Sequence, residues 1–308
     1  MGSSTSSFQN EKALKFVFTL AIGAFSAGGT VLTLEGLRAS VNINNAGGAV
    51  LSTLRANIFG MTASDMNAVT TTKWDPTFAK NTVEVYAVDG AQQTLVFQGN
   101  IVNAWGIYAG MPEVYLQVEA QNNYLGQITS PSPTRTTLTT STDIATVMQQ
   151  LATSLGVNFE NNGVTGTVRA GQTISGSYVD QVRTMAQTYN FSYFFDPTSN
   201  TLAITPLNNP RQTQSVPFVS PQSGLMGYPI FNGYGVQFDT LFNPAILFGG
   251  TVEVQSTIPK ANGTWMVVQM AHQLESQTPG GQWKSTVNSV YTASALGSLA
   301  AAATAAGL

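Results

Sequence analysis

The sequence contains no cysteine, and His272 is the only histidine in its 308 residues. The first absence excludes disulfides, thiolate catalysis and cysteine-based zinc sites, and the second excludes a histidine-rich metal site. A cysteine-free chain is compatible with any redox compartment, so cysteine usage does not locate the protein.

Charged residues are also scarce. They make up 9% of the chain, against roughly 25% in ordinary globular domains, and Ser, Thr, Asn, Gln and Gly take their place. A surface so poor in charge is unusual for a soluble monomer and suits a protein whose surfaces are buried against partners. The formal net charge of −3 does not favour nucleic acid as the main partner. An aqueous pore that carries DNA needs no net positive charge, so a channel function is not excluded.

Long hydrophobic runs are missing as well. No segment approaches the roughly 18–20 apolar residues that a membrane helix needs, and we expect no stable membrane insertion. Residues 12–27 have the basic start, short apolar stretch and small-residue exit of a signal peptide. We predict a β-strand there instead, because large and small side chains alternate with a period of two. The large side chains that share one face are Phe16, Phe18, Leu20 and Ile22.

The motifs that would carry chemistry are not found. The sequence has no Gly-x-Ser-x-Gly nucleophile elbow, no Walker or Rossmann phosphate loop and no Asp-rich calcium loop. Among its 15 Asp and Glu residues no pair stands out for glycoside hydrolysis. Its aromatic residues are not interleaved with basic ones, as a stacking platform for single strands requires. We therefore predict no catalytic residue, no cofactor-binding residue, no metal ligand and no cofactor.

His272 is the one obvious catalytic candidate. A serine hydrolase would need an acid and an activated nucleophile beside it, and the acids to consider are Asp239, Glu253 and Glu275. Strict alternation along residues 265–275 places His272 in the more apolar set of side chains. The other members of that set are Met266, Val268, Met270 and Leu274. We interpret His272 as a histidine satisfied by hydrogen bonds in or beside the core.

Residues 262–291 as a whole read as a long β-hairpin. A Pro279-Gly280-Gly281 turn separates two predicted strands, with Trp265 on one and Trp283 on the other. We expect this hairpin to close a barrel, with the two tryptophans as packing anchors.

The rest of the chain predicts a mainly β protein with an α+β insertion. Alternating strands and one short helix at residues 62–69 fill the first part, a pattern typical of a small barrel or sandwich. Helical spacing follows at residues 144–155 and 178–189, with Ser141 and Thr142 as candidate N-caps and Gly156 as a C-terminal cap. A hairpin around Asp196-Pro197 comes next, and strand character returns from residue 236 onward.

Residues 223–283 carry an ordered set of short motifs. They are Gly-Leu-Met-Gly-x-Pro at 224–229, Leu-x-Asn-Pro at 241–244, Gly249-Gly250 before a strand, and His-x-Leu-x-Ser with Pro-Gly-Gly-x-Trp at 272–283. This set resembles the baseplate hub family of contractile-tailed phages, the tube-to-spike adaptors that are also related to the hub part of type VI secretion spike proteins. Residues 58–68 and 96–103 resemble that family's first barrel, and residues 143–156 and 181–206 fit its α+β insertion. The resemblance covers residues 12–291.

The resemblance implies two tail-tube-type β-barrels and a small α+β domain in each subunit. On this basis we divide the chain into a flexible N-terminal arm (1–11), a first β-barrel domain (12–128), a linker (129–140), an α+β domain (141–206), a second β-barrel domain (207–292) and an Ala-rich C-terminal tail (293–308).

The resemblance also implies a structural protein without catalysis. It implies a homotrimeric hub with six barrels around a ring, bound by a tail tube or tube-initiator protein above, a central spike protein below and other baseplate proteins. Genomic DNA would pass through its lumen. The expected location is the tail baseplate of the virion, after assembly in the host cytoplasm.

Two alternatives belong to other classes. A secreted carbohydrate-binding or adhesin-like β-protein would share the amide-rich strands, and removal of the first 27 residues from the native protein would favour it. A cell-wall hydrolase would require wall-degrading activity that is lost in a His272→Ala variant.

Overall fold

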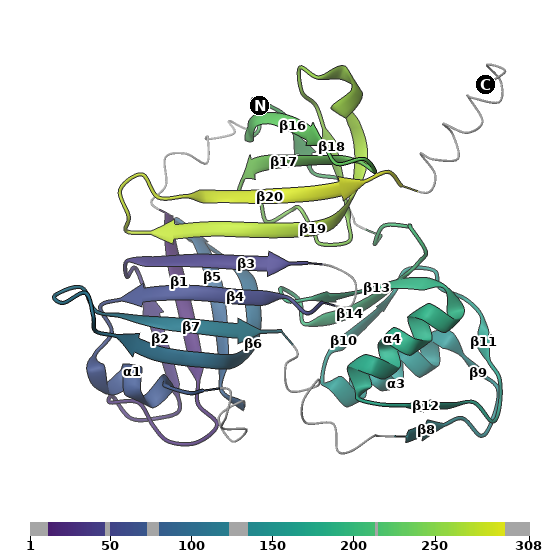
Figure 1. Ribbon diagram of the computed structural model, residues 1–308, viewed down its shortest axis with the longest axis horizontal. Helices are drawn as coiled ribbons and strands as arrows, with labels where there is room; N and C mark the ends of the chain where they lie inside the picture. Colours follow the sequence, from purple (N-terminus) through teal and green to yellow (C-terminus); the bar gives the residue numbers. More distant parts are fainter. Residues whose placement is uncertain (1–11, 47–49, 73–79, 123–134, 213–214, 293–308) are drawn as a thin grey trace.

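The computed structural model describes residues 12–46, 50–72, 80–122, 135–212 and 215–292 (Figure 1). Within these residues the protein is mainly β, with one large and mostly antiparallel sheet and a few helices. The predicted N-terminal arm, the C-terminal tail and the first half of the predicted linker, residues 129–134, lie outside the described residues.

The N-terminal part is built almost entirely of strands. Its elements are β1 (Lys12–Thr19), β2 (Val31–Glu35), β3 (Ala39–Asn45), β4 (Thr53–Phe59), α1 (Ala63–Val69), β5 (Thr82–Asp89), β6 (Gln92–Ile107) and β7 (Tyr115–Gln121). Buried side chains alternate with more exposed ones along β3, β4 and β7, as the two-residue period of a strand requires. The predicted short helix is present as α1, and Thr62 caps it by accepting a hydrogen bond from the backbone N–H of Asp65.

β1 confirms the prediction of a strand near the start of the chain. Both of its edges are paired, with β2 and with β5, and Leu14, Phe16 and Phe18 are buried. The prediction was wrong for Ile22, which is 60% exposed because the strand ends at Thr19. None of the helices in the described part of the chain is long and apolar enough to cross a membrane.

The middle part is an α+β layer. Its elements are β8 (Arg135–Thr137), β9 (Thr142–Asp143), α3 (Ile144–Leu155), β10 (Asn158–Asn161), β11 (Thr167–Val168), β12 (Thr173–Ser175), α4 (Tyr178–Tyr189), β13 (Phe191–Asp196) and β14 (Thr201–Pro206). Three strands form a sheet in the order β10-β14-β13, and both helices share one apolar core with it. Neither predicted N-cap is the N-cap of α3, because Asp143 accepts a hydrogen bond from the backbone N–H of Ala145. Gly156 ends α3 at φ 72°, as predicted.

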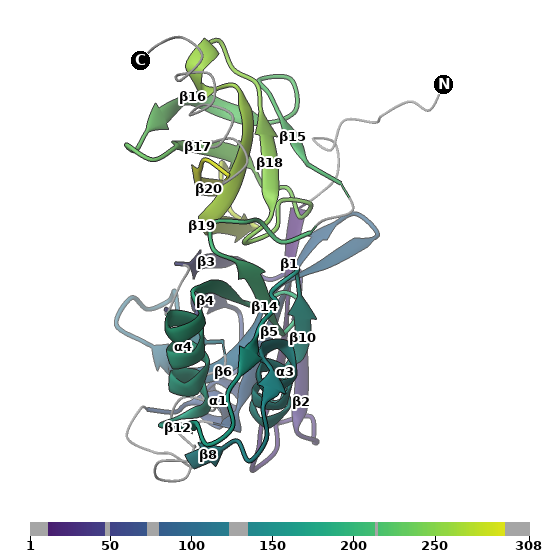
Figure 2. The ribbon, with the colours of Figure 1, turned by 90° about the vertical axis from the view of Figure 1, so that its right-hand side faces the viewer.

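The C-terminal part returns to strands. Its elements are β15 (Phe218–Val219), β16 (Leu225–Phe231), β17 (Val236–Leu241), β18 (Thr251–Val254), the 3-10 helix η2 (Pro259–Ala261), β19 (Gly263–Ser276) and β20 (Trp283–Val290). Figures 1 and 2 show these strands above both the N-terminal sheet and the α+β layer.

One sheet of thirteen strands links the two β parts. Its order is β16-β17-β20-β19-β3-β4-β7-β6-β5-β1-β2, with β15 and β18 attached beside β19. The structure confirms the predicted mainly β class. Within the described residues the hydrogen-bonded path is open at both ends, so no closed barrel is seen. We predicted that the hairpin of β19 and β20 closes a barrel. Instead, β19 pairs with β20 on one edge and with β18 and then β3 on the other, and so joins the two β parts.

Three apolar cores correspond to the three parts. The first lies under the N-terminal strands and includes Phe16, Phe97 and Leu116. The second lies between α3, α4 and the three-stranded sheet. The third fills the C-terminal part around Trp265 and Phe238.

Candidate functional site

The environment of His272 decides whether a catalytic site is present there. A β-bulge in β19 between Val267 and Gln269 shifts the alternation, so the strict alternation assumed from the sequence was wrong. The buried side chains after the bulge are Met270, His272, Leu274 and Ser276. His272 remains on the buried side, only 4% exposed, which confirms its predicted place in or beside the core.

The imidazole of His272 contacts Ser285 and Phe242. Its Nδ1 lies 2.7 Å from the hydroxyl oxygen of Ser285 on β20, the residue directly opposite in the strand register. The ring of Phe242 meets it edge-on at 5.3 Å. Burial lowers the pKa of His272 to about 4, so the ring is neutral at pH 7. Sequence reasoning missed Ser285, because the partner depends on the register of the hairpin.

The carboxylates near this strand have other partners. Asp239 accepts hydrogen bonds from Thr286 Oγ1 at 2.7 Å and Lys284 Nζ at 3.3 Å. Glu275 accepts a hydrogen bond from the backbone N–H of Gln282, and Glu253 is exposed on β18. The three acids considered from the sequence therefore do not form a triad with His272 and Ser285.

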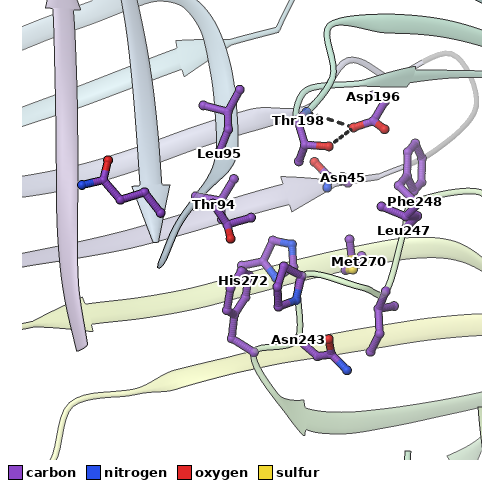
Figure 3. A pocket seen from close by; sticks show the side chains of 15 residues that line it. Asn45, Thr94, Leu95, Asp196, Thr198, Asn243, Leu247, Phe248, Met270 and His272 are labelled. Atoms are coloured by element: carbon purple, nitrogen blue, oxygen red, sulfur yellow. Dashed lines mark hydrogen bonds between the residues drawn. The ribbon is translucent and has the colours of Figure 1, made fainter. Parts of the chain in front are cut away.

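A pocket of about 380 Å³ opens beside His272 between the two β parts and the α+β layer (Figure 3). Asp196 also lines it but lies away from His272, and its carboxylate accepts hydrogen bonds from Thr198. The pocket therefore brings together no acid–base–nucleophile set.

Arg211 forms the most buried charge cluster in the described residues. Its guanidinium, in a side chain 6% exposed, lies 2.7 Å from Glu160 Oε2 and 2.8 Å from Asp196 Oδ2. It also donates a hydrogen bond to the carbonyl oxygen of Phe248. Because Glu160 and Asp196 belong to β10 and β13 while Phe248 precedes β18, this cluster ties the α+β layer to the C-terminal part.

The charge cluster is electrostatically matched. Burial by itself raises the pKa of Asp196, but the charge and hydrogen bonds of Arg211 and the hydrogen bonds from Thr198 outweigh it and hold that pKa below its ordinary value. The pKa of Glu160 is likewise lowered, with hydrogen bonds from Arg211 and Asn162 outweighing burial. A buried pair with satisfied hydrogen bonds is costly to break from one side. The cluster is therefore a structural joint.

Gly249 allows this joint to form. It has a φ of 79°, and a Cβ there would lie 3.0 Å from Arg211 Cδ and 3.0 Å from the Phe194 ring. Its backbone carbonyl accepts the N–H of Arg211 at 2.7 Å. The Gly249-Gly250 motif noted in the sequence therefore has a packing reason.

Uncharged amides and hydroxyls line the outward face of the thirteen-stranded sheet where the two β parts meet. We call it the amide face, and its residues around the β3–β19 contact are Asn42, Asn44, Gln269, Gln273, Thr286 and Asn288, which line a shallow depression. The strand register places Arg55 and Glu119 on the same face, beside Asn42. They form an ion pair of 2.6 Å, and Lys284 pairs with Asp239 at 3.3 Å.

At β16, the end of the sheet, the exposed side chains are apolar rather than polar. Large apolar side chains stand in solvent there, and we call them the β16 patch. They are Met226 (40% exposed), Tyr228 (71%), Ile230 (66%), Phe231 (51%) and Tyr234 (81%). β16 is a terminal strand in the sheet order, so it combines exposed apolar side chains with a backbone edge that no described strand pairs. The sequence pattern marked residues 224–229 as a motif but did not show which side of the strand is bare.

The chain matches the model of a known protein family. The family model described as "Baseplate hub gp41" matches residues 17–282. No curated protein matches the sequence significantly.

Solved structures share the fold at low sequence identity. A 43 kDa tail protein of prophage MuSo2 from Shewanella oneidensis has a TM-score of 0.58 and 10% identity, over 90% of this chain and 96% of that one. A tail protein from Neisseria meningitidis MC58 has a TM-score of 0.59 and 9% identity, over 90% and 96%. The E. coli c3393 protein, a component of the type VI secretion system, has a TM-score of 0.55 and 7% identity, over 83% and 74%.

Proposed function

Since the chain belongs to the baseplate hub gp41 family of phage tail structural proteins, we propose that three copies form a ring that joins the hexameric tail tube to the trimeric spike of a contractile tail. In this proposal each of the two β parts is a tail-tube-type barrel unit, and the α+β domain is inserted between them. The domain boundaries are those drawn from the sequence, residues 12–128, 141–206 and 207–292.

One observation carries this proposal: the two β parts are built on the same strand plan. The N-terminal sheet runs β3-β4-β7-β6-β5-β1, and the C-terminal strands run β16-β17-β20-β19-β18-β15. Each strand of the first series has a counterpart in the second at the same place in the chain order. The plans differ in that β15 runs parallel to β18, whereas β1 runs antiparallel to β5. Three chains therefore supply six similar units, enough to match a six-fold tube while the ring keeps three-fold symmetry toward a spike.

The amide face supports a channel. DNA that moves through a pore must not be held by unpaired cations, because neutralised phosphates give strong, salt-dependent binding. On this face the cations Arg55 and Lys284 are each paired with a carboxylate, and amides fill the positions between them. We place this face toward the lumen of the ring, in the path of the genomic DNA.

The proposal names partners and a place of assembly. The ring binds a tail tube or tube-initiator protein on one side, the central spike protein on the other and further baseplate proteins around it. It assembles in the host cytoplasm and acts in the virion without catalysing a reaction.

Light scattering and cryo-electron microscopy of the purified protein test the proposal. The expected mass is three times the 32.5 kDa of one chain, and the expected images show a ring of six β units with the amide face on the inside. A protein that stays monomeric at high concentration, and that is absent from the tail tip of its parent particle, would refute it.

A further inference from the structure

The contact between the two β parts within one chain shows how two such units can be joined. β19 pairs antiparallel with β3 over residues 270–276 and 39–45, so the sheet continues from one unit into the next. β3 pairs with the same edge of β19 as β18 does, but β18 pairs only up to residue 266. The second unit thus offers the late part of its longest strand, and the first unit offers its terminal strand.

The equivalent positions in the two units can be aligned at a β-bulge. β6 has a register shift between Ile101 and Asn103 against β7, and β19 has one between Val267 and Gln269 against β20. The residue after each bulge bonds the residue opposite: Asn103 donates to Glu119 Oε2, and Gln269 accepts from Asn288 Nδ2. Aligned in this way, residues 106 and 107 of β6 correspond to residues 272 and 273 of β19.

Among the described residues, no strand pairs with the matching edges of the two units in a single chain. Beyond Ile101, the β6 edge that does not face β7 is met, among the residues that the structure describes, only by Thr71, which bridges to Ala104. The described residues likewise place no strand on the outer edge of β16. β16 is the counterpart of β3, because it holds the same place in the strand order. In the described part of each chain there is therefore one further copy of each edge that the β19–β3 contact joins, and no strand pairs with it.

We propose that the β16 edge of one copy pairs with the late part of β6 of a second copy of this chain, repeating between copies the contact that β19 and β3 make within a chain. The register follows from the internal one. In the first unit the strand register runs from Asn103 through Glu119 and Arg55 to Asn42. In the second unit it runs from Gln269 through Asn288 and Gln237 to Ile230, so Ile230 corresponds to Asn42 and Phe231 to Ile43. Gln273 faces Asn42 and His272 faces Ile43 in the chain, so Ile107 faces Ile230, and Gly106 faces Phe231, across the contact. This inference rests on the proposed ring and identifies its subunit interface.

The exposed side chains agree with this partner. Ile230 is 66% exposed, Phe231 51% and Tyr234 81%, and their burial by a neighbour removes apolar surface from water. The addition of a strand satisfies the open backbone edge at the same time. The contact joins different edges of identical chains, so it is heterologous and generates a closed ring when the rotation between units closes.

Engineered cysteines test the register directly, because the chain has no cysteine of its own. Ile230→Cys and Ile107→Cys are placed in two differently tagged chains, which are co-expressed and treated with a short bis-maleimide. Within one chain six strands separate β16 from β6 in the sheet order, roughly 30 Å along the sheet, so a link between the two tags reports contact between copies. The double variant Asn42→Cys, Gln273→Cys tests the reagent on the internal contact, where the link stays within one chain.

The expected result is a covalent product that contains both tags in the co-expressed protein, and none with either cysteine alone. A matched control pairs Ile107→Cys with Ile22→Cys, and gives at least tenfold less product. Ile22 is 60% exposed but follows β1, near the opposite end of the sheet order from β16. A ring of three copies by light scattering, with no link between Ile230 and Ile107 or no more than in the control, overturns the inference and leaves the proposed hub intact. A monomer by light scattering, with no link, overturns both.

Discussion

Mild acid is expected to destabilise this protein through His272. A free histidine has a pKa of about 6.5, and burial lowers that of His272 to about 4. The folded state therefore favours the neutral ring. The stability that results is fully present above about pH 6.5 and is lost as the pH falls toward about 4.

The size of the effect follows from the same two values. Each pKa unit corresponds to about 1.4 kcal/mol, so the full difference is about 3 kcal/mol. At about pH 5 the unfolded state is almost fully protonated at this residue and the folded state is not, which costs about 2 kcal/mol relative to about pH 7.5. The carboxylates with lowered pKa values, such as Asp196 and Glu160, lose their contribution only at lower pH. The histidine is therefore the main cause in this range.

Urea unfolding followed by tryptophan fluorescence at the two pH values measures this. A His272→Gln variant keeps a polar group that can hydrogen-bond Ser285 but cannot be protonated. We expect the variant to lose about 2 kcal/mol less than the original protein between the two pH values. Gln273→His, on the exposed neighbouring position, serves as a control with no added acid sensitivity. Equal acid sensitivity in His272→Gln and the original protein would show that burial of His272 does not set the pH dependence.

Two further substitutions test the joint between the α+β layer and the C-terminal part. Arg211→Met leaves Asp196 buried without its cation and is expected to lower the free energy of unfolding, measured by heat or urea, by about 3–5 kcal/mol. The control Arg55→Met removes an arginine that is 65% exposed and is expected to lower it by at most about 1 kcal/mol. Similar losses for both variants would contradict the role assigned to Arg211. Gly249→Ala, where the Cβ meets two side chains at 3.0 Å, is expected to lower the melting temperature more than Gly280→Ala, whose φ of 70° is similar but whose surroundings are open. If the two alanine variants melt together, crowding at residue 249 is not the reason for glycine.

Local sequence patterns predicted most of the elements correctly. The helices α3 and α4 follow from apolar spacing and caps, and β1 follows from alternation that a signal helix does not show. These features depend on side chains within a few residues of one another. The predictions were wrong where the end of a strand or a β-bulge, set by pairing with distant strands, interrupts the local alternation of side chains. The end of β1 at Thr19 exposes Ile22, and the bulge in β19 interrupts the strict alternation that the sequence suggests.

The candidate surfaces were less predictable. Arg211 is an ordinary residue in a connector of the sequence, and only the fold brings Glu160 and Asp196 to it from separate strands. Ser285 faces His272 only because of the hairpin register. The sequence predicts strand character only from residue 236 onward, so β16 and its exposed patch were missed. Apolar composition also does not show which strand of a sheet has no neighbour.

The sequence by itself determined the chemical character of this protein. It has no cysteine, one histidine and few charges, which exclude several kinds of active site, and its ordered motifs indicate the hub family. The tertiary structure decided how the parts are joined. Strand pairing between residues more than 200 positions apart, as in the contact of β19 with β3, depends on which edges remain free after each unit folds. No local pattern encodes that choice, because backbone hydrogen bonds of a sheet edge are the same for every strand.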